Sequence, residues 1–155
     1  MDIPTSELFK EPVKIVEKIY NGISYRIITT PPPIYEEAFK KFGASFDKGI
    51  VFTYGRDVHV KIGKLRDDVE AHETVHVVQQ TTYPGGPEAW WKRYMEDSEF
   101  LLDQELEAYR AQYKFVLKNY PKREHFEMLK FYAECLSGFY DLGIGMMTAM
   151  NLIKK

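Results

Sequence analysis

The sequence predicts an α+β fold in which a small antiparallel β-sheet of about three strands precedes a helix-rich part that extends to the C-terminus. Three observations support this prediction. Runs of β-branched and aromatic residues, which are typical of strands, lie in the first half of the chain. Apolar residues three and four positions apart, which are typical of amphipathic helices, dominate the second half. No internal repeat or linker divides the chain, so we expect one domain over residues 1–155.

The first strand-like segments lie on either side of a turn. Residues 5–20 alternate apolar and charged positions only loosely, and Pro12 limits them to a short helix or strand before the turn at Asn21–Gly22. Residues 23–30 are β-branched and aromatic, which indicates a strand, and three consecutive prolines end it.

A hairpin is expected next in the chain. Residues 34–42 have the spacing of a short amphipathic helix. Two strand-like runs follow at residues 49–54 and 58–63, and the Gly-Arg-Asp segment between them suits a tight turn. These runs complete the predicted sheet.

Five helices are expected after the sheet. The first begins at Asp67 or Asp68, where a carboxylate can cap the helix, and runs to about Thr81. The Pro-Gly-Gly-Pro segment that follows is the strongest break in the chain. The other helices are expected at residues 88–95, 98–119, 124–139 and 143–153. In the fourth helix the residues spaced for burial are Phe126, Leu129, Ala133 and Leu136.

The composition excludes several classes of partner. The formal net charge is −2 and the basic residues are spread among acidic ones, so we expect no binding to nucleic acid or to an anionic membrane. Cys135 is the single cysteine and lies in an apolar helical pattern, which favours a buried, inert thiol in a reducing compartment. The N-terminus lacks the features of a signal peptide, and no run of about 18 apolar residues occurs. We therefore expect a soluble protein that is made in the cytoplasm.

The segment His72-Glu73-Thr74-Val75-His76 has the pattern H-E-x-x-H inside a predicted helix. Residues four apart lie on one face of a helix, so His72 and His76 can both direct a ring nitrogen at one ion, with Glu73 beside it. A catalytic Zn²⁺ needs neutral imidazoles at about 2.0–2.1 Å, a third protein ligand and an open position for water. The pattern therefore predicts a zinc site that lacks one ligand.

Two downstream carboxylates are candidates for that ligand, and helix periodicity separates them. Glu105 lies on a stripe that is otherwise apolar and faces the core, whereas Glu107 lies on a charged stripe with Arg110. A buried carboxylate is costly unless it is paired or binds a metal ion. Glu105 is therefore the predicted third ligand, and Glu107 the surface charge.

H-E-x-x-H followed on a later helix by Glu-x-x-Ala, here residues 105–108, resembles the gluzincin class of zinc metallopeptidases. The resemblance implies that His72, His76 and Glu105 bind zinc and that Glu73 is the general base. Tyr109 stands where gluzincins often have an Asp that orients the first histidine. Its hydroxyl is able to orient an imidazole or to donate to an oxyanion.

Residues 77–80, 107–112 and 136–140 also resemble small phage-encoded metallopeptidase-like proteins. This resemblance implies a minimal zincin-like domain that hydrolyses a peptide or protein substrate, with zinc activating water and Glu73 transferring its proton. An extended substrate would pair with an edge strand at residues 50–54 or 58–62. The resemblance is compatible with a place in a phage particle after synthesis in the cytoplasm.

A different class of function is an alternative. The protein could bind zinc as a structural or interaction protein, such as a component of a phage particle, with little or no peptidase activity. Eleven Tyr, ten Phe and two Trp suit an interface, including contacts in a homo-oligomer. Against this, Glu73 is present, and a structural zinc more often has four protein ligands. For His59, His125, Trp90, Trp91 and the methionines at 146, 147 and 150, packing or exposure is favoured over a role in chemistry.

Overall fold

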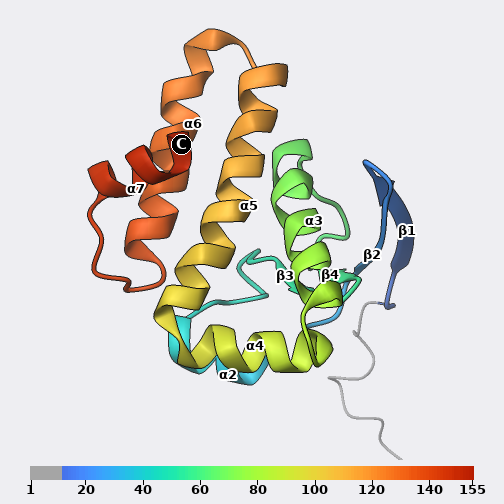
Figure 1. The fold of residues 1–155 in the computed structure, drawn as a ribbon. Helices are drawn as coiled ribbons and strands as arrows, with labels where there is room; N and C mark the ends of the chain where they lie inside the picture. Colours follow the sequence, from blue (N-terminus) through green and yellow to red (C-terminus); the bar gives the residue numbers. More distant parts are fainter. Residues whose placement is uncertain (1–11) are drawn as a thin grey trace, which may run out of the picture.

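The computed structural model describes residues 12–155 and has the predicted α+β fold. Its described part contains a four-stranded sheet and six helices (Figure 1). The strands are β1 (Ile15–Tyr20), β2 (Ile23–Ile28), β3 (Phe52–Tyr54) and β4 (Asp57–His59). The helices are α2 (Tyr35–Phe42), α3 (Asp67–Thr82), α4 (Gly86–Glu96), α5 (Ser98–Asn119), α6 (Lys122–Gly138) and α7 (Met146–Lys154).

The sheet differs from the prediction in strand number and in direction. It has four strands in the order β1-β2-β4-β3, because the segment left open as a short helix or strand forms β1. The part of that segment before residue 12 lies outside the described residues. The sheet is mixed because β2 pairs parallel to β4, with Arg26 opposite Asp57. A parallel pair needs a long crossover connection, which α2 and its flanking loops supply here.

Both predicted turns in the sheet are present. Asn21 and Gly22 have φ angles of 48° and 79°, as the tight turn of a hairpin requires, and they join β1 to the antiparallel β2. Gly55 and Arg56 join β3 to β4, with Tyr54 opposite Asp57. Since β4 pairs with β2 on its other side, β3 is left at the outer edge of the sheet.

The helix boundaries agree with the predicted ones to within a few residues. The Asp97 carboxylate caps α5 by accepting hydrogen bonds from the backbone N–H groups of Glu99 and Phe100. The last helix begins three residues later than predicted, because Gly143 has a φ of 71°, which a helix does not allow. Phe126 was predicted to be buried but is 60% exposed, since it lies at the margin of the face of α6 that packs on α5 and α7.

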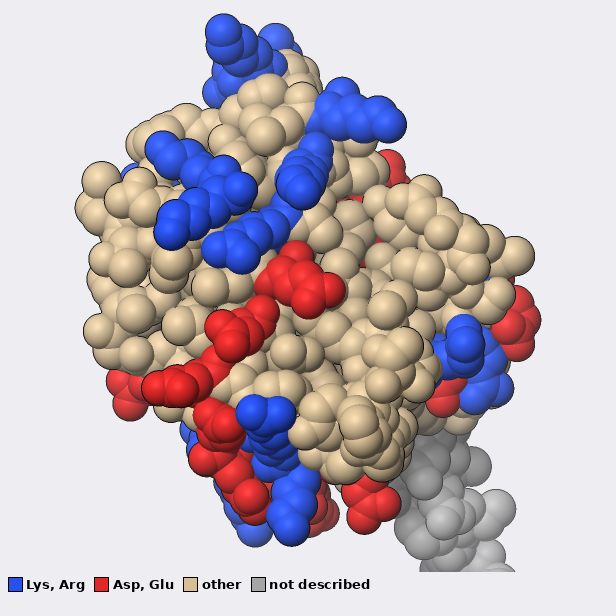
Figure 2. Space-filling view, viewed as in Figure 1, with Lys and Arg blue, Asp and Glu red and all other residues tan. Residues whose placement is uncertain are grey.

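Helix α3 lies between the sheet and α5, so both of its sides are covered (Figure 1). Helices α6 and α7 pack on the far side of α5, and α4 crosses the lower ends of α3 and α5 in this view. The face shown in Figure 2 carries basic side chains in its upper part and a band of acidic ones below, so neither sign of charge covers it. Within residues 12–155, no helix is both long and apolar enough to cross a membrane.

Candidate metal centre

Helices α3 and α5 bring the three predicted ligands together in the interior. His72, His76 and Glu105 are 7%, 6% and 3% exposed, and their ligand atoms lie within 4.8 Å of one another. His72 Nε2 is 3.1 Å from His76 Nε2 and 3.3 Å from Glu105 Oε2. His76 Nε2 is 3.4 Å from Glu105 Oε1. In contrast, Glu107 is exposed on the opposite face of α5, as the helix periodicity predicted.

The distances between these atoms suit a tetrahedral ion. Ligand atoms at 2.0–2.1 Å from zinc with tetrahedral angles are about 3.3 Å apart. The two ring nitrogens are 3.1 Å apart, and they lie 3.3 and 3.4 Å from different oxygens of the Glu105 carboxylate. The side chains could therefore hold a small divalent cation, and no fourth His, Cys, Asp or Glu of residues 12–155 joins the group.

A hydrogen-bond chain fixes the tautomer of His72. Gln112 donates from Nε2 to Asp68 at 2.9 Å, so its Oε1 faces His72 Nδ1, which lies 2.9 Å away. Asp68 is held in turn by Arg66 and by the Tyr132 hydroxyl, at 2.9 and 2.6 Å. Because Oε1 can only accept, Nδ1 carries the proton and Nε2 presents a lone pair to the centre.

His76 is oriented in the same way by a residue of its own helix. Gln79 donates from Nε2 to the backbone carbonyl of Gln104 at 3.0 Å, and its Oε1 lies 2.8 Å from His76 Nδ1. The Nε2 atom of His76 is therefore also unprotonated when the ring is neutral. Each histidine thus donates its Nδ1 proton to an oxygen acceptor, as metal-binding imidazoles commonly do, and here the acceptor is a side-chain amide.

Glu105 adds a negative charge to the buried group that it forms with His72 and His76. The Tyr94 hydroxyl donates to Glu105 Oε1 at 2.6 Å, whereas Oε2 is buried and has no hydrogen-bond partner among the described residues. Burial alone would raise the pKa of Glu105, but the charge of the protonated His76 beside it lowers it well below its ordinary value. A carboxylate and two ring nitrogens thus point at one place, where a metal ion could replace the proton that His76 carries.

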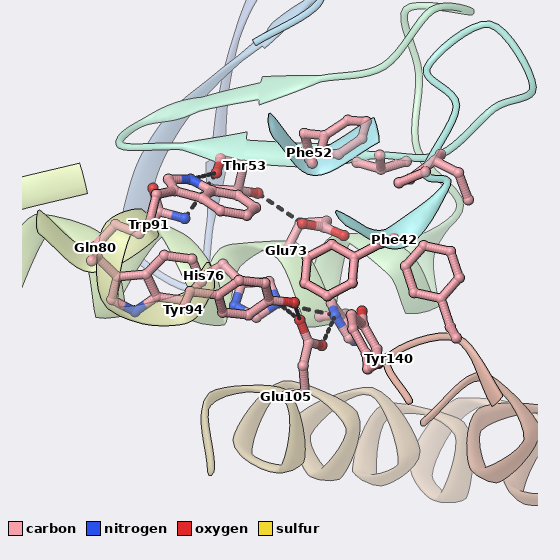
Figure 3. Close-up of a pocket in the computed structure, with 17 residues that line it drawn as sticks. Phe42, Phe52, Thr53, Glu73, His76, Gln80, Trp91, Tyr94, Glu105 and Tyr140 are labelled. Atoms are coloured by element: carbon pink, nitrogen blue, oxygen red, sulfur yellow. Dashed lines mark hydrogen bonds and ion pairs between the residues drawn. The ribbon is translucent and has the colours of Figure 1, made fainter. Parts of the chain in front are cut away.

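Glu73 lies beside this group and is held by the sheet. Its Oε2 accepts a hydrogen bond of 2.7 Å from the Thr53 hydroxyl on β3, and both side chains are buried (Figure 3). Glu73 follows His72 directly in α3, so its carboxylate projects toward β3 and the cavity between them, away from α5. Glu73 is therefore not one of the three candidate ligands, but it lies close to them.

Tyr109 contacts His72 through its ring. The two ring centroids are 4.6 Å apart and the planes meet at 73°, an edge-to-face contact. Burial raises the pKa of the Tyr109 phenol well above its ordinary value, so it stays protonated and able to donate. The hydrogen-bond partner of the His72 ring is Gln112, three residues further along α5, and sequence reasoning missed it.

The remaining histidines are separate from this group. His59 is buried at the end of the inner strand β4, with Nδ1 2.7 Å from the backbone carbonyl of Thr30. His125 is half-buried at the start of α6, where Nε2 lies 2.8 Å from the carbonyl of Tyr120. Met150 is buried against α5 and α6, whereas Met147 is 66% exposed.

Two cavities adjoin the ligand group. The first, of about 60 Å³, is lined by the three ligands, Glu73 and aromatic side chains that include Trp90 and Trp91 (Figure 3). The tryptophans therefore pack in the core and line this cavity as well. The second, of about 220 Å³, shares His72 and Glu73 with the first and reaches the exposed side chains of Arg66 and Phe131.

The fold and the site together define an α+β protein with a buried His-His-Glu group that could hold a metal ion. Comparisons with protein-family models, with curated proteins and with solved structures find no match.

The role of Gln112 can be tested by a substitution that keeps its size. We expect Gln112→Met to weaken zinc binding by about 10- to 100-fold, because His72 loses the acceptor that fixes its tautomer. Gln104→Met is the matched control, since Gln104 is also an amide of α5 but its side chain accepts from Trp90 instead. Competition titrations with a zinc indicator measure both affinities. Equal affinity in wild type and Gln112→Met would show that the amide does not orient the ligand.

Proposed function

We propose that this protein is a zinc-dependent metallopeptidase of the gluzincin type, built as a single minimal zincin-like domain. The observation that supports the proposal best is the convergence of His72 Nε2, His76 Nε2 and the Glu105 carboxylate, with both ring tautomers fixed by amide oxygens. Two imidazoles and one carboxylate are a ligand set of catalytic zinc sites, and three protein ligands leave the fourth position open. Zinc bound there would supply a Lewis acid and lower the pKa of a water molecule to about 7.

The chain's own residues supply the proton transfers. Glu73 lies in the cavity next to the ligands, where its carboxylate accepts the proton of the attacking water and delivers it to the leaving amine. The Thr53 hydroxyl holds one carboxylate oxygen at 2.7 Å, which leaves the other for this exchange. Tyr109 keeps its hydroxyl proton, because burial raises its pKa, so it can donate to developing negative charge, whereas the Tyr94 hydroxyl already donates to Glu105.

A structural or interaction protein that binds zinc is the second candidate, and one surface favours it. Strand β1 is at the edge of the sheet, and its Ile15, Val16 and Ile19 are 53%, 44% and 74% exposed. Exposed apolar residues on an edge strand suit pairing with another chain, either a second copy or a component of a phage particle. The two functions are compatible, since a peptidase can belong to an assembly.

The proposal is tested by measuring zinc content and peptide cleavage in the same sample. We expect one zinc per chain and hydrolysis of peptides that stops when a chelator removes the metal and resumes when zinc is returned. One zinc per chain without cleavage of any peptide in a diverse library would favour the structural candidate. No stoichiometric metal would refute both candidates.

The protonation of His76 predicts how the affinity for zinc changes with pH. Burial lowers the pKa of His76 in the metal-free protein, but the charge of Glu105 opposes burial and raises it to about 9. Below that pH a proton occupies the Nε2 lone pair, and metal binding must release it. We therefore expect the apparent zinc affinity to rise by about tenfold per pH unit between about pH 6 and pH 8. Competition titrations at several pH values measure it, and an affinity independent of pH would contradict the account.

A further inference from the structure

The outer edge of β3 is covered by side chains that lie next to the ligand group. Gln80 of α3 donates from Nε2 to the backbone carbonyl of Thr53 at 2.8 Å and accepts from the backbone N–H of Gly55 at 2.7 Å. Trp91 of α4 donates from Nε1 to the same Thr53 carbonyl at 3.0 Å. Figure 3 shows Gln80 and Trp91 side by side at this edge. The Gln80 amide therefore takes the place of one peptide group of an added strand.

This cover limits where an extended peptide can pair. Backbone groups of alternate residues point to the same edge of a strand, so Val51 and Thr53 both face away from β4. A substrate that adds to β3 as a further strand would pair with these residues. Gln80 and Trp91 already hydrogen-bond the outward backbone groups of Thr53 and Gly55. A substrate backbone therefore ends at Thr53 and can pair only with the part of the edge at Val51.

Two cavities lie along this edge, and the smaller one is at its covered end. The cavity at the covered end, about 60 Å³, is lined by buried side chains that include Trp90 and Trp91. Gln80, which covers the edge, also lines this cavity and is fully buried, so the cavity is closed at that end. The cavity of about 220 Å³ meets the small one at Val51, His72 and Glu73 and extends from there to the exposed side chain of Arg66. The edge of β3 is therefore closed at Thr53 and open toward Val51.

The direction of the substrate follows from antiparallel pairing, which is the commoner kind. A chain antiparallel to β3 has its N-terminal end beside the C-terminal end of β3, which is the covered end. The residues lining the small cavity include Glu73 and Glu105 and no Lys or Arg, so a terminal ammonium group meets no like charge from those side chains. We propose that the site releases the first residue from the free N-terminus of a peptide, because the substrate backbone ends at Thr53, whose hydroxyl holds Glu73. This inference rests on the proposed peptidase function.

Cleavage-site mapping tests the inference with the zinc-loaded, full-length protein. The probes are a peptide that begins with a free Ala and the same peptide preceded by two further residues and an acetyl group. We expect the free peptide to lose its first residue and the blocked peptide to remain intact. Internal cleavage of the blocked peptide in a sample with one zinc per chain would overturn the inference and leave the peptidase function standing. Cleavage of neither peptide nor of a wider library would overturn both.

A binding measurement supplies a readout that does not depend on turnover. In zinc-loaded Glu73→Gln, calorimetry is expected to show the blocked peptide binding at least about tenfold more weakly than the free one. Gln80→Ala removes the amide that covers the edge and is expected to reduce this difference, whereas Thr82→Ala, an exposed change in the same helix, should leave it unchanged. Equal binding of both peptides to Glu73→Gln would overturn the inference, even if Gln80→Ala does not fold.

Discussion

Glu105→Ala is expected to lose stoichiometric zinc, with an affinity at least about a hundredfold below that of the wild type. Removing the hydrogen-bond partner of a metal ligand lowers metal affinity by up to about a hundredfold. Removing a charged ligand itself should lower it further. The carboxylate is buried, its Oε2 has no partner among the described residues, and it faces both histidines at 3.3 and 3.4 Å. Without it, two neutral imidazoles are the only protein ligands left in the group.

The matched control for this change is Glu107→Ala, two residues further along the same helix. Glu107 is exposed and lies on the face of α5 away from His72 and His76, so its loss should leave the zinc content at one per chain. Metal analysis after dialysis against a weak chelator, together with circular dichroism to confirm folding, compares the two variants. Zinc retained in Glu105→Ala and lost in Glu107→Ala would reverse the assignment of the third ligand.

Glu73→Gln is expected to reduce peptide hydrolysis by about 10²- to 10⁴-fold while the zinc content stays at one per chain. The amide has nearly the same shape and can still accept the hydrogen bond from Thr53, but it cannot take a proton from water. The measurement is the rate of cleavage of one peptide by both proteins at equal zinc content.

Glu88→Gln serves as the control for Glu73→Gln, because Glu88 is an exposed carboxylate at the start of α4. It makes the same change of charge away from the ligand group, so its rate should match that of the wild type. If Glu73→Gln hydrolyses the peptide as fast as Glu88→Gln, Glu73 is not the general base. If it also loses zinc, its role is in holding the site together.

The residues of the His-His-Glu group could be predicted from the sequence because they obey helix periodicity. His72 and His76 are four residues apart in α3, and Glu105 is the polar member of an otherwise apolar stripe in α5. These are relations within one helix, and they do not depend on how helices pack. The same reasoning separated Glu105 from Glu107 and placed the boundaries of α3 and α5 within a residue or two.

What the sequence did not predict depends on contacts between elements. Gln112 orients His72 only because α5 packs beside α3 and Asp68 fixes its amide. Thr53 reaches Glu73 only because the sheet covers α3. A polar Gln beside the apolar stripe of α5, and Gln79 three residues after His76, were signals that could have identified both amides. The parallel pairing of β2 with β4 gave no local signal, because it depends on the path of a long connection.

Anomalous X-ray scattering from crystals of the zinc-loaded protein would show whether His72, His76 and Glu105 bind one zinc ion. Data collected on both sides of the zinc absorption edge locate the metal independently of any assumption about its ligands. The account predicts a single strong peak per chain about 2.0–2.2 Å from Nε2 of both histidines and from a carboxylate oxygen of Glu105. A peak at another site, or none between α3 and α5, would contradict it.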